Sequence, residues 1–249
     1  MKYLFKLILG ANLISIYQLA KLNFKGFVIA ARNSFFAGKS YVPLPEIELK
    51  EILGTEKIKL TLDIDIMEDG ALPIEQCVVL LAILAIEKPK VILEIGTFMG
   101  STTKKMSENL PDAIIHTVDL PIDFSACNDP NTEIPKDDFH LISKRDVGRE
   151  FRNTEFANRI YQHFVDTAKW DFKEVGNPSF FFIDGSHTYE YCKNDSEKCF
   201  QIAASSSTFV WHDCDSIHPG VVKFLKECRK KGLDVKRISG TPLAYLKAE

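Results

Sequence analysis

Residues 91–102 read VILEIGTFMGST, a short apolar run followed by a glycine turn and then by small polar residues. The run lacks the alternation expected of a strand with one face in water, and is typical of a parallel strand buried on both faces. Similar runs recur at residues 114–118, 180–183 and 209–211, with helical segments between them. The chain therefore predicts an α/β, doubly wound, Rossmann-like sheet that is mostly parallel.

Other segments of the chain add helices and strands to this sheet. Residues 73–88 predict a helix that begins at Pro73 and ends before Pro89. The third strand has two candidates, Phe139–Ser143 and Ile160–Val165, of which we favour the second. The connection 120–158 is rich in charge and proline, and long connections of this kind are often binding loops or lids. Near the end, residues 235–238 and 243–246 predict two strands around a turn.

The charge of the chain is distributed unevenly. With 31 Lys+Arg against 34 Asp+Glu the net charge is −3, too close to neutral to favour nucleic acid as a partner. Residues 1–45 nevertheless contain six basic residues and no acidic one, which leaves −9 on the other 204 residues. We therefore divide the chain into a basic N-terminal arm, 1–45, and a main domain, 46–249.

Polar residues in the arm recur at spacings of three and four, which predicts an amphipathic helix. Such a helix packs on the domain or a second subunit, or lies at a membrane surface, and the sequence leaves peripheral membrane contact and a homo-oligomer both open. Its longest uncharged run, residues 7–20, is shorter than the roughly 20 residues of a spanning helix. Together with six scattered cysteines without a CxxC pair, this favours a cytoplasmic protein.

The first candidate site surrounds the glycine turn. Gly96 and Gly100 permit close approach of a ligand, and Ser101 with the helix amides offers donors to a carboxylate. Asp119 ends the next strand, 23 residues after Gly96, where an acidic residue can accept both hydroxyls of a ribose. Glu94 lies inside the apolar strand, and a buried carboxylate needs donors, which a ligand ammonium would supply.

The second candidate site combines two strand ends. Asp184 and Asp213 each follow a buried strand, and neighbouring parallel strands lie about 4.8 Å apart, so the two carboxylates could share one divalent cation. His187 follows in the next loop and could take a proton from a substrate hydroxyl. Asp195 is expected to support the helix or its neighbours.

These motifs resemble class I S-adenosylmethionine-dependent methyltransferases, in particular the metal-dependent O-methyltransferases that include catechol and macrocin-type sugar enzymes. The resemblance covers residues 70–247 and is strongest at EIGTFMGST, FFFIDGSHTYE and WHDCD. It implies seven strands with the last antiparallel, a small-molecule or glycan acceptor, S-adenosylmethionine as cofactor and Mg²⁺ as a candidate ion.

The resemblance also assigns roles to residues. His187 would be the general base. The cofactor would be bound by Glu94, Gly96, Thr97, Gly100, Ser101, Asp119, Asp166, Thr167 and Asp184, with Asp166 and Thr167 by the adenine. The metal ligands would be Asp184, Asp213 and His212. His212 stands where the family has a carboxylate, and Mg²⁺ prefers oxygen ligands, so the metal stays open.

Two other functions stay open at this point. A nicotinamide-dependent oxidoreductase would use a similar sheet, although the spacing Gly-x-x-x-Gly lacks the third glycine of that fingerprint. A non-catalytic cofactor-binding or docking scaffold would have no need of a histidine beside two carboxylates. The sequence therefore favours O-methylation of a small-molecule or saccharide hydroxyl.

Overall fold

The computed structural model describes residues 44–62, 71–121 and 146–248. Its α-helices are α4 (Leu49–Leu53), α5 (Ile74–Glu87), α6 (Ser101–Asn109), α8 (Arg149–Arg152), α9 (Tyr189–Ile202) and α10 (Pro219–Lys230), with short 3₁₀ helices η2 (Ala157–Arg159) and η3 (Phe172–Val175). The strands are β1 (Glu46–Ile47), β2 (Val91–Ile95), β3 (Ile114–Asp119), β4 (Ile160–Phe164), β5 (Phe180–Ile183), β6 (Thr208–Trp211), β7 (Lys236–Ile238) and β8 (Ala244–Lys247).

The described strands form one sheet in the order β1-β7-β8-β6-β5-β2-β3-β4. All neighbours are parallel except that β8 is antiparallel to both β6 and β7. This confirms the mostly parallel, doubly wound sheet with its last strand antiparallel. The resemblance implied seven strands, and the structure adds the two-residue β1 at the edge beside β7.

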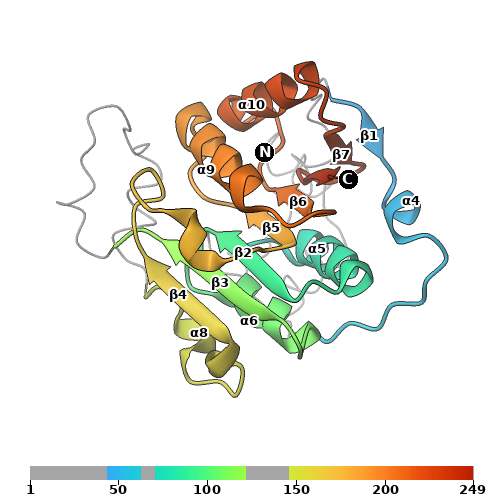
Figure 1. Ribbon diagram of the computed structural model, residues 1–249. Helices are drawn as coiled ribbons and strands as arrows, with labels where there is room; N and C mark the ends of the chain where they lie inside the picture. The colour runs from blue at the N-terminus through green and yellow to red at the C-terminus, as the bar shows by residue number, and fades with distance from the viewer. Residues whose placement is uncertain (1–43, 63–70, 122–145, 249) are drawn as a thin grey trace, which may run out of the picture.

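Helices cover both faces of the sheet, with α9 and α10 on one side and α5, α6 and α8 on the other (Figure 1). The two apolar layers differ in composition. The first contains stacked aromatic rings of the central strands, including Phe181 on Phe209 at 4.5 Å. The second is mainly aliphatic and includes the Leu and Ile residues of α5. Because β5 and β6 are buried along their whole length, they read in the sequence as unbroken apolar runs.

From β2 the chain continues outward on one side, to β3 and then β4. It then crosses back over the sheet and continues on the other side of β2, to β5 and then β6. In open α/β sheets this switch point, beyond the carboxyl ends of the strands, is where ligands bind. The register pairs Ile95 with Ile183, and Ile183 with Trp211, so the three strands end side by side. The loops that follow β2, β5 and β6 therefore begin next to one another.

The structure confirms β4 as the third strand of the motif, close to the bounds predicted for it. It also confirms the helix after Pro73 and the two C-terminal strands. The predicted helix of the arm, most of the long connection and the alternative strand at 139–143 lie outside the described residues. Among the described helices, none is long and apolar enough to cross a membrane.

Candidate active site

The glycine turn after β2 is shaped by its contact with the end of β5. Gly96 has φ +103°, and a Cβ placed there would lie 2.0 Å from the carbonyl oxygen of Asp184. Gly100 begins α6 with φ +87°, and its missing Cβ leaves room for the ring of Phe151. Both glycines thus allow close packing, and the lack of a side chain at Gly96 lets the ends of β2 and β5 approach each other.

Glu94 lies fully buried in β2 and is the centre of a hydroxyl network. Its Oε2 accepts hydrogen bonds from Thr103 at 2.5 Å and Thr117 at 2.6 Å. The Thr97 hydroxyl lies 2.7 Å from that of Thr117, and it must be the donor because Thr117 gives its own hydrogen to Glu94. Thr97 therefore supports Glu94 through Thr117.

The second oxygen of Glu94 has a different environment. Oε1 is buried and has no hydrogen-bond partner among the described residues. Burial raises the pKa of Glu94 to about 8, although the two threonine hydroxyls act in the opposite direction. A buried carboxyl oxygen without a partner is the feature that a ligand ammonium would satisfy, so this part of the site fits the methionine end of S-adenosylmethionine.

Asp119 holds the backbone of the glycine turn. Its Oδ2 accepts from the amide of Phe98 and its Oδ1 from the amide of Leu120, both at 2.7 Å. Phe98 has φ +48°, an unusual value for a residue with a side chain, and the Asp119 contact stabilises it. Asp119 therefore lies at the end of β3 with both of its oxygens directed at backbone amides, one of them in the glycine turn.

Asp166 and Thr167 lie after β4 and are fixed by α9. Asp166 accepts from the hydroxyl of Tyr191 at 3.2 Å, and the carbonyl of Thr167 accepts from Lys198 at 2.5 Å. Asp195, also on α9, is fully buried, and burial raises its pKa to about 6. This agrees with the expected supporting role of Asp195. The loop therefore has a defined shape, and it lies at the end of β4 and not beside His187.

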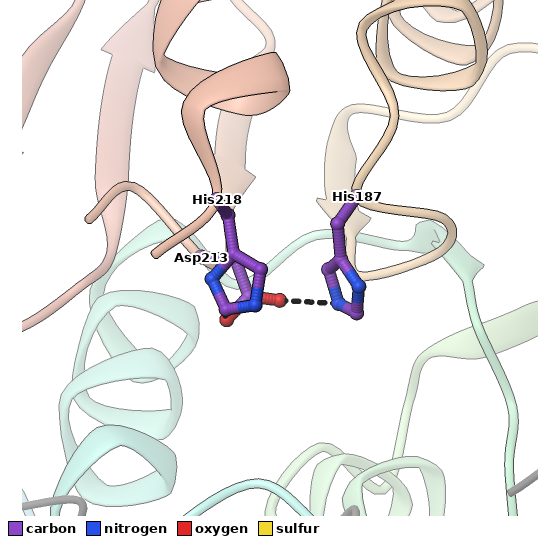
Figure 2. A group of neighbouring side chains, drawn as sticks. All are labelled: His187, Asp213 and His218. Carbon is purple, nitrogen blue, oxygen red and sulfur yellow. Dashed lines mark ion pairs between the residues drawn. The ribbon is translucent and has the colours of Figure 1, made fainter. Parts of the chain in front are cut away.

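A second cluster joins His187, Asp213 and His218, whose side chains point toward one another (Figure 2). His187 Nε2 lies 2.6 Å from Asp213 Oδ2, and His218 Nδ1 lies 3.3 Å from Asp213 Oδ1. The two imidazole rings are 4.4 Å apart at their centroids. Within this cluster, Asp213 contacts His187 with one carboxylate oxygen and His218 with the other.

The loop around His187 and the start of α10 are packed closely. Thr188 caps α9 by accepting from the amide of Tyr191. A Cβ at Gly220 would lie 2.6 Å from the carbonyl oxygen of His187, so only glycine allows the first turn of α10 to approach the loop this closely. This approach brings His218, the residue before α10, beside His187.

Asp213 itself has φ +57°, in the left-handed region. For a residue with a side chain this conformation costs about 1–3 kcal/mol and persists only where the surroundings impose it. Here the imidazoles of His187, His212 and His218 hold the carboxylate. Strained residues of this kind cluster at functional sites, and Asp213 is a candidate of that kind.

His212 lies between the two strand-end carboxylates. Its Nδ1 is 2.8 Å from Asp184 Oδ1 and 3.1 Å from Asp213 Oδ2, and its Nε2 is 2.6 Å from Oε1 of Gln76. Burial by itself lowers the pKa of His212, but the charges of Asp184 and Asp213 raise it well above the usual value. In the same way burial raises the pKa of Asp213, and the charge of His212 more than offsets this and lowers it well below the usual value.

The donor set can be compared with what Mg²⁺ requires. The ligand atoms of Asp184, His212 and Asp213 lie within 4.8 Å of one another, close enough in space for an ion. Mg²⁺ prefers oxygen ligands in near-octahedral arrangement, however, and here both nitrogens of His212 already face hydrogen-bond acceptors. The residues therefore do not suit Mg²⁺.

The structure thus brings together the predicted residues in two groups. Glu94, Thr97 and Asp119 surround the turn after β2, and Asp184, His187, His212 and Asp213 gather at the ends of β5 and β6. Ser101 accepts from Lys105 at 2.5 Å on the first turn of α6. The sequence reasoning missed His218 and Gln76. His218 precedes a proline-initiated helix three residues after Asp215, which is a usable signal, whereas Gln76 has none because it lies 136 residues from its partner.

Known proteins similar to this chain are methyltransferases. Residues 93–214 match the family described as a methyltransferase domain. Similar solved structures include a Staphylococcus aureus protein described as a caffeoyl-CoA O-methyltransferase, with TM-score 0.53 and 13% identity over 72% of this chain and 85% of that one. The SAH-bound Podospora anserina methyltransferase PaMTH1 has TM-score 0.53 and 15% identity over 73% and 81%. The O-methyltransferase NovP has TM-score 0.52 and 13% identity over 70% and 78%.

The likeness to these structures concerns the fold, and comparison of the sequence with curated proteins gives no match. The family match begins within β2 and ends at the residue after Asp213, so it includes the predicted site residues but not His218. Residues 93–214 therefore match a methyltransferase domain, and the described chain has the fold of solved methyltransferases.

Proposed function

We propose that the protein transfers the methyl group of S-adenosylmethionine to a hydroxyl oxygen of a small molecule or saccharide. The observation that carries this proposal is the pair His187–Asp213, 2.6 Å apart, at the carboxyl ends of the strands beside the switch point. A histidine oriented by a buried carboxylate is an arrangement suited to taking a proton from a hydroxyl near neutral pH.

In this proposal the turn after β2 holds the cofactor. Glu94 receives the ammonium on its unpartnered oxygen, Asp119 accepts from the ribose, and Gly96, Gly100 and Ser101 border the methionine carboxylate. Asp166 and Thr167 border the adenine, with the loop kept in shape by α9. The cofactor supplies an electrophilic methyl group on a sulfonium.

The residues after β5 and β6 then act on the acceptor. His187 takes the hydroxyl proton as the oxygen–carbon bond forms and the carbon–sulfur bond breaks, and the electron pair of that bond stays on sulfur. Asp213 orients the imidazole and stabilises the imidazolium that results. In-line displacement needs mainly positioning and deprotonation, and both are within the reach of these residues.

The proposal is tested with S-adenosylmethionine carrying a labelled methyl group and a panel of sugars, catechols and aliphatic alcohols. We expect label to enter at least one hydroxyl compound, with mass spectrometry locating the methyl group on oxygen. The matched control is His187→Gln, which should bind the cofactor and transfer label at least roughly a hundredfold more slowly than wild type. Transfer only to nitrogen or carbon acceptors, at a rate independent of His187, would contradict the proposal.

A further inference from the structure

The two carboxylates at the ends of β5 and β6 are the feature from which this inference starts. Ile183 and Trp211 pair in the parallel register, so Asp184 and His212 begin neighbouring loops. The amide of His212 donates to the carbonyl of Ile183 at 3.0 Å, which extends the ladder by one bond beyond β6. The backbone of His212 is therefore fixed by the sheet.

The ring of His212 is fixed as well. Nδ1 lies within hydrogen-bond distance of both Asp184 and Asp213, and Nε2 lies 2.6 Å from the side-chain oxygen of Gln76 on α5. Its side chain is 15% exposed and that of Asp213 is 10% exposed. The carboxylate of Asp184 is partly buried, with its side chain 21% exposed. A buried and a partly buried carboxylate this close together need a positive or hydrogen-donating group between them, and the ring nitrogen occupies that place.

We propose that His212 takes the place of a divalent cation in this site: its Nδ1–H joins the carboxylates of Asp184 and Asp213, and methyl transfer proceeds without Mg²⁺. The inference rests on the proposed function for the role of the site, but the ion requirement can be measured without turnover. It is carried by the contacts of Asp213, because both of its oxygens face imidazole nitrogens, from His187 and His212 on Oδ2 and from His218 on Oδ1. An ion would have to displace these contacts.

The ligand preferences of divalent ions also argue against Mg²⁺ in this site. Replacing one carboxylate of an oxygen-ligand set by imidazole removes a negative charge and a hard donor, both of which Mg²⁺ needs. The second candidate group, His187, Asp213 and His218, also lies within 4.8 Å, but its two nitrogens suit borderline ions such as Zn²⁺ and not Mg²⁺. The experiment therefore has to detect a tightly held ion of any kind.

The first measurement uses the full-length wild-type protein. We expect no heat of binding with Mg²⁺ or Mn²⁺ at millimolar concentration, and the same thermal midpoint and the same affinity for S-adenosylhomocysteine before and after treatment with EDTA. A drop in the midpoint or in cofactor affinity after EDTA, restored by a divalent ion, would overturn the proposal.

The second measurement asks whether the imidazole is what replaces the ion. His212→Asp gathers three carboxylates at the two strand ends, so we expect Mg²⁺ to bind at least about tenfold more tightly than to wild type, since affinity follows ligand charge. The matched control is His212→Asn, which has the same shape without the charge and should bind more weakly than His212→Asp. If His212→Asp folds and shows no gain, the proposal is wrong; if it does not fold, the wild-type measurement alone decides.

Discussion

Nε2 of His187 lies 2.6 Å from Oδ2 of Asp213, and the two residues come from loops that follow different strands of the sheet. The contact exists because β5 and β6 are parallel neighbours, so that their carboxyl ends open on the same edge. A general base held by a buried carboxylate needs this kind of convergence, and the parallel sheet provides it.

The first prediction concerns this pair. His187→Gln should lower kcat roughly 10²- to 10⁴-fold, the range expected for loss of a general base, because the amide cannot take the acceptor proton. Affinity for S-adenosylhomocysteine should stay unchanged in calorimetry. His116→Gln, a histidine on β3 that pairs with His163, is the control and should keep wild-type kcat. Equal losses in the two variants would argue against a special role for His187.

The second prediction concerns Glu94 and the cofactor. Glu94→Gln should weaken S-adenosylmethionine roughly tenfold to a hundredfold, since hydrogen bonds to charged groups contribute about 1.5–3 kcal/mol. Wild type should also release a proton on binding, because the ammonium favours the ionised form of a group whose pKa burial raises to about 8. Calorimetry in buffers of different ionisation enthalpy measures that proton. Glu197→Gln on α9, whose partner is Lys231, should change neither quantity.

The same variant has an expected effect on stability. In the unfolded chain Glu94 ionises near 4.5, whereas in the folded protein burial keeps it protonated up to about pH 8. Between these values the unfolded state has lost its proton and the folded state has not, so wild type loses stability as pH rises through this window. Glu94→Gln should therefore gain stability relative to wild type from pH 4.5 to about 8 in urea unfolding. A constant difference between the two proteins would contradict the assignment.

The third prediction uses the stacked histidines of β3 and β4. Burial, and secondarily the neighbouring His163, lowers the pKa of His116 from 6.5 to about 4, and burial also lowers that of His163. Between pH 6.5 and about 4, His116 is protonated in the unfolded chain but stays neutral in the folded protein. The free energy of unfolding therefore falls as pH falls through this window. His116→Gln should show a shallower fall in urea midpoint than wild type. Identical pH profiles would show that His116 does not titrate as described.

The fourth prediction concerns the contact between two strand ends. Gly96→Ala should cost about 3 kcal/mol or more of unfolding free energy, because its Cβ would overlap the carbonyl of Asp184 in addition to the strain of positive φ. Gly232→Ala is the matched control: its φ is +95° and a Cβ there meets nothing within 4 Å, so only the backbone strain of about 1 kcal/mol is expected. Similar losses measured by urea unfolding would mean that the overlap is relieved.

Much of this fold could be predicted because strands buried on both faces appear as unbroken apolar runs, as in β5 and β6. Asp184 and Asp213 could be placed together because neighbouring parallel strands end at the same edge of the sheet. β1 could not be predicted, since two residues carry no periodicity and the strand exists through the amides of Arg237 and Ser239, which donate to the carbonyls of Pro45 and Ile47. Long-range contacts of this kind leave no local pattern.

In the candidate site, too, contacts between residues far apart in the sequence could not be predicted. The sequence places His212 beside Asp213 but says nothing of Gln76, whose contact with the imidazole depends on how α5 packs against the sheet. Nor does it reveal the left-handed backbone of Asp213, which turns the carboxylate toward three histidines. The structure therefore adds the hydrogen-bond partners of each carboxylate, which the sequence does not show.

The most direct test of the central claim is a calorimetric titration with S-adenosylmethionine and S-adenosylhomocysteine, with NAD as the control ligand and Asp119→Ala as the control protein. We predict micromolar binding of both sulfur ligands to wild type, weaker binding to Asp119→Ala, which lacks the ribose acceptor, and no binding of NAD. Absence of binding by both sulfur ligands to a folded wild-type protein would contradict a methyltransferase that uses the site at the ends of β2 and β3.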